Sequence, residues 1–279
     1  MADPAWVALT LTRQLGGKTF RALLAHFDHN LHDILNADEA DLRQVPGIGR
    51  KTARAIRQTD LGKVEVCMRR WQHHVQIVTW NDGAYPLALK ATEDSPPTLF
   101  VRGTLPDMTR ACAIVGTRRP AAESSALASK LAGDLAERGY TIVSGLALGI
   151  DKTAHQGALT IPGGQTVAVL GSGVLNVFPR ENREFASAII ERGALISEVA
   201  PDSNVSTPGL VARNRIISGL SKLVVVVESS FDGGAMPAAR FAALQGRPVY
   251  AADNAASGNQ ALLANGALPV DAIWEDFMV

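Results

Sequence analysis

The pattern of apolar and polar positions changes along the chain and marks two kinds of structure. In the first 60 residues, apolar side chains such as Phe20, Leu23 and Phe27 recur at three- and four-residue intervals. This spacing predicts short amphipathic helices. Further along, short apolar runs alternate with helical segments. Continuous runs such as Leu223–Val227 are typical of strands in a parallel sheet that is covered on both faces.

Six apolar runs are the candidate strands of this sheet. They are Ala111–Val115, Thr141–Val143, Thr166–Leu170, Ala194–Ser197, Leu223–Val227 and Pro248–Ala251. Because strands and helices alternate, we predict an α/β protein with a doubly wound, Rossmann-like, mainly parallel sheet. A small all-α domain precedes it. We predict a helical domain over residues 1–66 and the α/β domain over residues 67–279. Around Ser95-Pro96-Pro97 the chain is extended, which predicts a linker or an addition to the sheet edge.

Composition and charge limit the classes of function. The chain is 47% hydrophobic and 19% charged, and its net charge is zero. Residues 1–70 hold 11 basic and 8 acidic side chains, so a nucleic-acid surface would have to be a local patch. Cys67 and Cys112 are the two cysteines, which argues against a disulfide framework. The sequence has no signal peptide and no apolar run long enough for a membrane span, so we expect a cytoplasmic protein without membrane contact.

A basic turn lies in the predicted helical domain. From Arg43 to Arg57 there are five basic residues and no acidic residue. Within this segment the turn Gly47-Ile48-Gly49, followed by Lys51, resembles the hairpin of the helix-hairpin-helix family. The resemblance implies that Gly47, Gly49 and Lys51 contact a DNA phosphate, with at most a weak contact to double-stranded DNA. The alternative is a turn that contacts nothing or contacts another protein.

Three histidines in the same domain do not indicate a metal site. His26, His29 and His32 are spaced three apart, but no cysteine or carboxylate set completes a recognisable site. A solvated or partly packed helix face is the simpler interpretation. We therefore expect no metal and no cofactor.

The candidate binding residues are those next to the predicted strands. In an open α/β sheet, ligands bind beyond the carboxyl ends of the strands. Glycine, hydroxyl and arginine residues dominate these positions, which suits a phosphate chain better than an apolar metabolite. The candidates are Gly116, Thr117, Arg118, Arg119, Ser144, Gly145, Lys152, Gly171, Arg213, Asn214, Arg215 and Lys222.

The order of the motifs around these residues resembles that of the DNA-processing protein A family (DprA, also called Smf). The motifs are AIVGTR from Ala113, SGLALGIDKTAH from Ser144, AVLGSGV from Ala168, Phe178-Pro179 and RNRIISGLS from Arg213. The resemblance extends through residues 75–270. It implies a homodimeric, non-catalytic protein that binds single-stranded DNA. Such a protein protects incoming strands and helps to load the RecA recombinase during natural transformation.

The resemblance also implies how the strand is held. Gly116, Thr117 and Arg118 would form the pocket together with Arg213, Asn214 and Arg215 on the same rim. We expect the arginines and the backbone N–H groups of Gly116 and Thr117 to bind phosphates. Lys152 and Lys222 are added only because of their charge. For base stacking, Phe178 and Phe231 are the best candidates, although a core position is the more common one for phenylalanine.

The sequence departs from the family pattern at three places. Leu210-Val211-Ala212 stands where the family has phenylalanine-proline before the RNR motif, and Asp232-Gly233-Gly234 replaces a Ser-Gly-Ser segment. Near Asp253-Asn254 a Pro-Gly pair is missing. Many members also carry a C-terminal winged-helix-like domain, for which residues up to 279 leave no room. We expect either a truncated chain or a short family member.

Three other classes of function compete with this interpretation. Asp151 and His155 lie four residues apart, on one face of a predicted helix, and with Glu198 could serve a nucleotide hydrolase that cleaves the glycosidic bond. We interpret the pair as a helix cap and a packed side chain. A dinucleotide oxidoreductase and a P-loop NTPase both lack their glycine motifs. A protein-interaction scaffold would not explain Arg118 and the RNR cluster.

Overall fold

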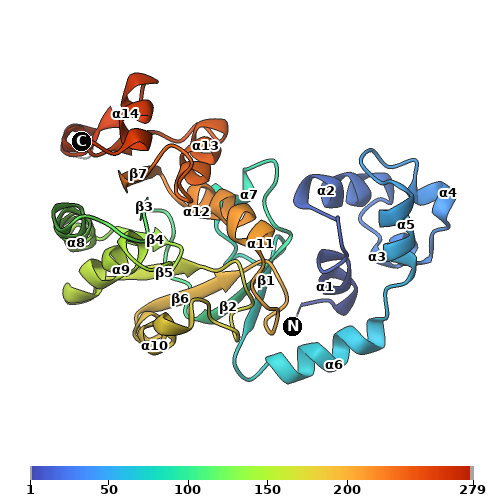
Figure 1. The fold of residues 1–279 in the computed structure, drawn as a ribbon. Coiled ribbons are helices and arrows are strands. Elements are labelled where there is room, and N and C mark those ends of the chain that lie inside the picture. Colours follow the sequence, from blue (N-terminus) through green and yellow to red (C-terminus); the bar gives the residue numbers. More distant parts are fainter. Residues whose placement is uncertain (1, 277–279) are drawn as a thin grey trace.

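The computed structural model describes residues 2–276, which begin with six helices. These are α1 (Pro4–Thr10), α2 (Gly17–His26), α3 (Leu31–Asn36), α4 (Glu39–Leu42), α5 (Arg50–Arg57) and α6 (Leu61–Trp71). Short polar side chains start several of them. Asp38 accepts hydrogen bonds from the N–H groups of Ala40 and Asp41 and so caps α4. Figure 1 shows α2 to α5 as a group beside the α/β body, with α6 leading into it.

The rest of the described chain forms one nine-stranded sheet and its covering helices. The strands are β1 (Gln76–Thr79), β2 (Thr98–Gly103), β3 (Ala111–Gly116), β4 (Thr141–Ser144), β5 (Thr166–Val169), β6 (Gly193–Ser197), β7 (Leu223–Glu228), β8 (Val249–Ala251) and β9 (Leu268–Pro269). The helices are α7 (Leu87–Lys90), α8 (Ala122–Glu137), α9 (Ile150–Thr160), α10 (Arg183–Glu191), α11 (Thr207–Ala212), α12 (Asn214–Leu220), α13 (Met236–Leu244), α14 (Ser257–Ala264) and α15 (Ile273–Asp276). The predicted fold class is confirmed.

The strand order places a crevice near the middle of the sheet. The order is β1-β2-β6-β5-β4-β3-β7-β8-β9, and every pairing from β6 to β9 is parallel. After β3 the chain adds β4, β5 and β6 on one side of β3 and then returns to place β7 on its other side. The boundary between β3 and β7 is therefore a topological switch point, where doubly wound folds bind ligands.

Helices cover both faces of the sheet, as its apolar strands require. Along β3, Cys112 and Ile114 belong to the apolar cluster under α8 and α9, whereas Ala113 and Val115 belong to the cluster under α12 and α13. Alternate side chains of one strand thus enter opposite layers. Among residues 2–276, no helix is long and apolar enough to cross a membrane.

The proline-rich stretch adds strands to the sheet edge. It leads into β2, which pairs antiparallel with both β1 and β6. The first helices pack against this edge: Trp6 and Phe20 make edge-to-face contacts with Trp80, and the Trp6 indole N–H donates to the Pro97 carbonyl at 3.1 Å. One apolar cluster therefore extends from the helices into the sheet. The division at residue 66 stays a prediction.

Candidate functional site

A cavity of about 570 Å³ lies at the switch point of the sheet. Its walls come from the loop after β3, the start of α9, the segment around α11 and α12, and the loop after β7. The residues of these walls include Gly116, Thr117, Arg118, Arg119, Ala147, Asp151, Thr207, Leu210, Arg213, Asn214, Ser229, Ser230, Gly233 and Gly234. The structure thus brings together predicted residues from two segments that are far apart in the sequence.

A second cavity, of about 200 Å³, adjoins the first. Both are lined by Arg118, Ala147, Leu210 and Arg213. Apolar side chains dominate the rest of the smaller cavity, with Leu148, Phe178 and Pro179 in its wall. We refer to the two cavities together as the groove. The two arginines are common to both cavities, and the smaller cavity adds an apolar surface and the acidic residue Glu181.

Arg118 and Arg119 lie on an exposed loop that is tightly held at its base. The Thr117 N–H donates to the Glu228 carbonyl at 2.7 Å, and the Thr117 carbonyl accepts from the Ile150 N–H at 3.1 Å. Both arginine side chains are exposed, and neither forms an ion pair with another described residue. The predicted phosphate contact by the Thr117 N–H does not fit this geometry, because Glu228 already occupies that donor.

Arg213 lies on the floor of the groove, where the residue is only 8% exposed. One guanidinium nitrogen donates to the Val169 carbonyl at 2.9 Å, and another lies 3.5 Å from an Asp151 carboxylate oxygen. Burial lowers the pKa of Arg213, and Asp151 opposes this effect. Gly145 makes room for the guanidinium, since a Cβ atom there would lie 1.2 Å from one of its nitrogens.

Asp151 also fixes the loop between β4 and α9. Its carboxylate accepts hydrogen bonds from the N–H groups of Gly145 and Ala147, at 3.2 and 3.3 Å. Leu146 between them has a φ of 59°, and its carbonyl accepts a 2.9 Å hydrogen bond from the Asn182 side chain. Asp151 is therefore a structural residue, but its interpretation as the helix cap is wrong: Gly149 is the N-cap of α9, and the Asp151 carboxylate binds the preceding loop and Arg213.

His155 is fully buried beneath this loop and is not available for acid–base chemistry. Its Nδ1 lies 2.6 Å from the Thr166 hydroxyl, which itself donates to the Ile142 carbonyl. The histidine Nδ1–H is therefore the donor in this pair. Burial, with a smaller effect of Arg213, lowers the pKa of His155 to about 3. The ring is neutral at physiological pH and cannot reach the groove.

The depressed pKa of His155 predicts a pH-dependent stability. In the unfolded chain, histidine has a pKa of about 6.5. Below that pH the unfolded chain therefore binds a proton at this residue that the folded chain does not bind. The free energy of unfolding should fall as the pH drops from 6.5 toward 5, by up to about 1.4 kcal/mol per pH unit. Urea unfolding of His155→Gln should lack this part of the slope, whereas the exposed His73→Gln should keep it. Equal slopes in all three proteins would contradict the assignment.

Four predicted residues do not present a side chain to the groove. Ser144 is fully buried, and its hydroxyl donates to the Ile114 carbonyl at 2.6 Å. Gly171 lets α11 approach the sheet, since a Cβ there would lie 2.8 Å from the Leu210 nitrogen. The Lys152 ammonium lies 5.8 Å from the centre of the Phe185 ring. Lys222 precedes β7 and therefore lies at the opposite, amino-terminal edge of the strands.

Arg215 also lies outside the groove, although Arg213 and Asn214 line it. Successive residues of a helix are rotated by about 100°, so Arg213 and Arg215 point to nearly opposite sides. Arg215 forms ion pairs with Asp94 and Glu198 instead. The structure therefore does not place all three RNR residues on one rim.

The N-terminal hairpin forms a separate exposed surface. Gly47 has a φ of 88°, which favours glycine, and Gly49 precedes the first residue of α5. Both glycines and Lys51 are exposed, whereas Ile48 between them is buried. In Figure 1, α5 lies on the far side of the helical group from the sheet. The hairpin therefore does not contribute to the groove.

Both candidate stacking residues are exposed, and the expected core position is wrong for each. Phe178 is 39% exposed and Phe231 is 54% exposed, so neither is a core residue. Phe178 lines the smaller cavity, whereas Phe231 donates its backbone N–H to the Ser257 hydroxyl outside it. Ser229 and Ser230 follow β7 and could have been found by the strand-end rule. Thr207, which also lines the larger cavity, does not follow a strand, so this rule could not have found it.

The comparison with known proteins decides the family. The family model described as DNA recombination-mediator protein A matches residues 76–278.

The chain belongs to the DNA recombination-mediator protein A family.

Its first helices match a second model, the SAM-like helix-hairpin-helix tandem, over residues 9–59. Protein Smf of Synechocystis is 32% identical over 274 residues, which cover 94% of this chain and 68% of that protein. The chain spans about half to two thirds of the length of the curated relatives that it matches.

Two solved structures of the family have a similar fold. The X-ray structure of DNA processing protein A from Streptococcus pneumoniae superimposes with a TM-score of 0.83 at 26% identity and covers 99% of both chains. DNA processing protein A from Helicobacter pylori gives a TM-score of 0.65 at 27% identity, over 73% of this chain and 98% of that one. The latter structure is described as showing a single-stranded DNA binding mode.

Proposed function

We propose that this recombination-mediator family member binds single-stranded DNA along the groove at the switch point. The observation that carries the proposal is the contrast between two arginines that line both cavities. Arg118 is exposed and has no acidic partner among the described residues, while Arg213 is held on the floor by Asp151 and Val169. An exposed guanidinium above a prepared cationic floor suits a phosphate oxygen. The single-strand binding mode of the Helicobacter pylori relative supports this assignment.

The binding we propose is tolerant of sequence. Arg118 and Arg119 hold phosphates, and the exposed Phe178 ring gives one base a surface on which to stack. Every base has a π-face, so stacking on an aromatic ring does not select a sequence. This arrangement uses a phenylalanine at a different position from the family's phenylalanine-proline pair, where this chain has Leu210-Val211-Ala212.

The N-terminal hairpin gives a second, weaker contact in this proposal. The exposed residues Gly47, Gly49 and Lys51 at the start of α5 are placed to meet a phosphate of single- or double-stranded DNA. We further propose that the protein is a homodimer in the cytoplasm. There it protects incoming strands and helps RecA to assemble on them during natural transformation. The family description as a recombination mediator supports this role.

A gel-shift assay with a base-release assay in parallel tests the proposal. The purified chain is mixed with a single-stranded oligonucleotide, its duplex, or a nucleoside monophosphate. We expect a shift with the single strand at a lower protein concentration than with the duplex, and no free base. Release of base would favour the nucleotide hydrolase instead, in spite of the buried Asp151–His155 pair. Equal binding of duplex and single strand would contradict the groove as the main site.

A further inference from the structure

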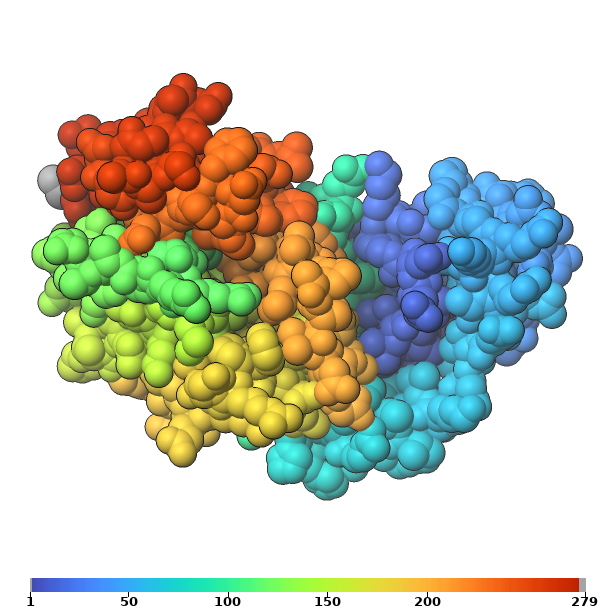
Figure 2. Space-filling view, in the orientation of Figure 1, coloured from blue at the N-terminus to red at the C-terminus, as the bar shows by residue number. Residues whose placement is uncertain are grey.

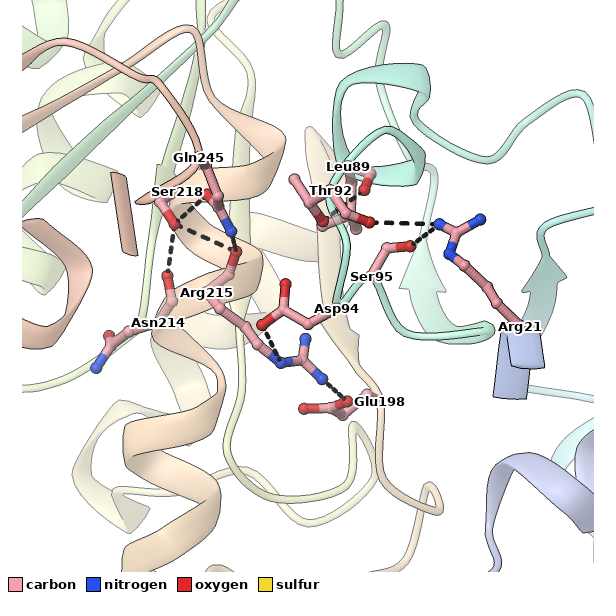
Figure 3. A network of polar contacts seen from close by, with 10 residues as sticks. All are labelled: Arg21, Leu89, Thr92, Asp94, Ser95, Glu198, Asn214, Arg215, Ser218 and Gln245. Carbon is pink, nitrogen blue, oxygen red and sulfur yellow. Dashed lines mark hydrogen bonds and ion pairs between the residues drawn. The ribbon is translucent and has the colours of Figure 1, made fainter. Parts of the chain in front are cut away.

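Arg215 is a largely buried cation with two acidic partners outside the groove. Its side chain is only 13% exposed, and its Nε lies 3.5 Å from an Asp94 carboxylate oxygen. A terminal guanidinium nitrogen forms an ion pair with Glu198, which directly follows β6. Figure 3 shows the guanidinium between these two carboxylates. Arg215 therefore joins the start of α12 to the end of β6 and to the connector before β2.

The backbone of Arg215 is held as well. Its carbonyl accepts a 2.9 Å hydrogen bond from the Gln245 side-chain amide, whose oxygen accepts a 2.6 Å bond from the Ser218 hydroxyl. Both bonds are drawn in Figure 3. Gln245 follows α13, so the first turn of α12 is fixed on one side by the Arg215 side chain and on another by α13.

The same turn carries two residues of the groove. Arg213 lies on the opposite side of α12 from Arg215 and is fixed by Val169 and Asp151. Asn214 between them lines the larger cavity. Because one short helix connects these residues, any shift of α12 toward or away from β6 moves the groove floor.

The connector that carries Asp94 is itself held in place. Arg21 of α2 donates to the Ser95 hydroxyl at 2.7 Å and to the Thr92 carbonyl at 3.3 Å. Figure 3 shows Arg21 on the other side of this loop from Arg215. The backbone on both sides of Asp94 is therefore held, and its partly exposed carboxylate is presented to Arg215 from a fixed loop.

We propose that Arg215 is a positioning residue of the single-strand groove: it sets the place of α12, and through it Arg213 and Asn214, without contacting DNA. This inference rests on the proposed function, but it departs from the expectation that both arginines of the RNR motif bind phosphate. A largely buried guanidinium that pairs with two carboxylates and lines neither cavity is not placed to meet a phosphate in the groove.

Salt dependence distinguishes positioning from phosphate contact. Each phosphate contact that is lost reduces the slope of log affinity against log salt by about 0.7 for single strands. Arg215→Gln should weaken single-strand binding by about tenfold and leave the slope unchanged. Arg215→Lys keeps the positive charge but loses the planar guanidinium that can pair with two carboxylates. It should therefore recover part of the affinity. Arg240→Gln, an exposed arginine on α13, controls for the loss of one charge and should bind as the parent protein does.

Two results of the titration with Arg215→Gln would overturn the proposal. One is a slope reduced by about 0.7 in Arg215→Gln, which would show a phosphate contact. The other is an unchanged affinity. If Arg215→Gln does not fold, the binding of Asp94→Asn tests the proposal in its place. The Asp94 side chain is 43% exposed, so its replacement leaves the core intact. Asp94→Asn should weaken binding at constant slope, and an unchanged affinity would overturn the proposal.

Hydrogen exchange without DNA separates this inference from the proposed function. The amides of residues 214–220 should exchange faster in Arg215→Gln than in the parent protein, while those of α8 should not change. Faster exchange in a protein that does not bind single strands would leave the positioning role standing and refute the proposed function. Unchanged exchange would refute the positioning role even if single strands are bound.

Discussion

Gly145→Ala is expected to destabilise the protein by about 3 kcal/mol, and to weaken its binding to single-stranded DNA, because the new methyl group would occupy the place of the Arg213 guanidinium. A Cβ atom at residue 145 would lie 1.2 Å from one Arg213 nitrogen and 1.9 Å from Cζ. The guanidinium must then leave Val169 and Asp151. Removing the partner of a buried ion pair costs about 3–5 kcal/mol, and the displaced side chain would enter the groove.

Urea unfolding and single-strand titration of the same preparation measure both effects. Gly83→Ala is the matched control, since Gly83 has no atom within 4 Å of its Cβ position and lies outside the groove. The control should retain both stability and affinity. If Gly145→Ala kept the parent affinity and stability, Arg213 would not have the role that its contacts indicate.

Arg118→Ala is expected to weaken the binding of all single-stranded sequences alike, by at least about tenfold at low salt. Arg118 lines both cavities, is exposed and has no ion-pair partner among the described residues. Its removal should therefore cost a phosphate contact and leave folding intact. The slope of log affinity against log salt should become shallower by about 0.7.

Titration of labelled homopolymers of different base, at several salt concentrations, measures this effect. Arg240→Ala removes an exposed charge elsewhere and should change neither affinity nor slope. A loss confined to one base would indicate that Arg118 reads the base and not the phosphate. An unchanged affinity would remove Arg118 from the site.

The fold was largely predictable because its strands are continuous apolar runs. All six predicted strands are present, and their ends differ only slightly from the prediction. The strand-end rule also placed Arg118 and Arg119 correctly in the cavity. The strand order was not predicted, since it depends on pairing between segments far apart in the chain, such as β3 with β7.

The errors in the site have physical reasons. Lys222 precedes its strand, so the rule that selects carboxyl ends should have excluded it. Arg213 and Arg215 carry the same charge, but they point to nearly opposite sides of the helix. Arg213 therefore pairs with Asp151 and Arg215 with Glu198. The sequence does not show that Asp94, far away along the chain, is one of those partners. The exposure of Phe178 likewise depends on tertiary packing.

The groove and the hairpin are separate surfaces of one molecule. In Figure 2 the helical group in blue and cyan stands beside the body that carries the sheet. A strand bound in the groove would have to leave it to reach Lys51 on α5. The two surfaces can therefore be tested independently, and the groove is the one on which the proposed function depends.

The salt dependence of single-strand binding by the unmodified chain tests the central claim most directly. Fluorescence anisotropy of a labelled oligonucleotide is measured at increasing salt concentrations. If Arg118 and Arg119 each neutralise a phosphate, log affinity should fall linearly with log salt, with a slope of about −1.4. An affinity that does not depend on salt would contradict phosphate binding in the groove.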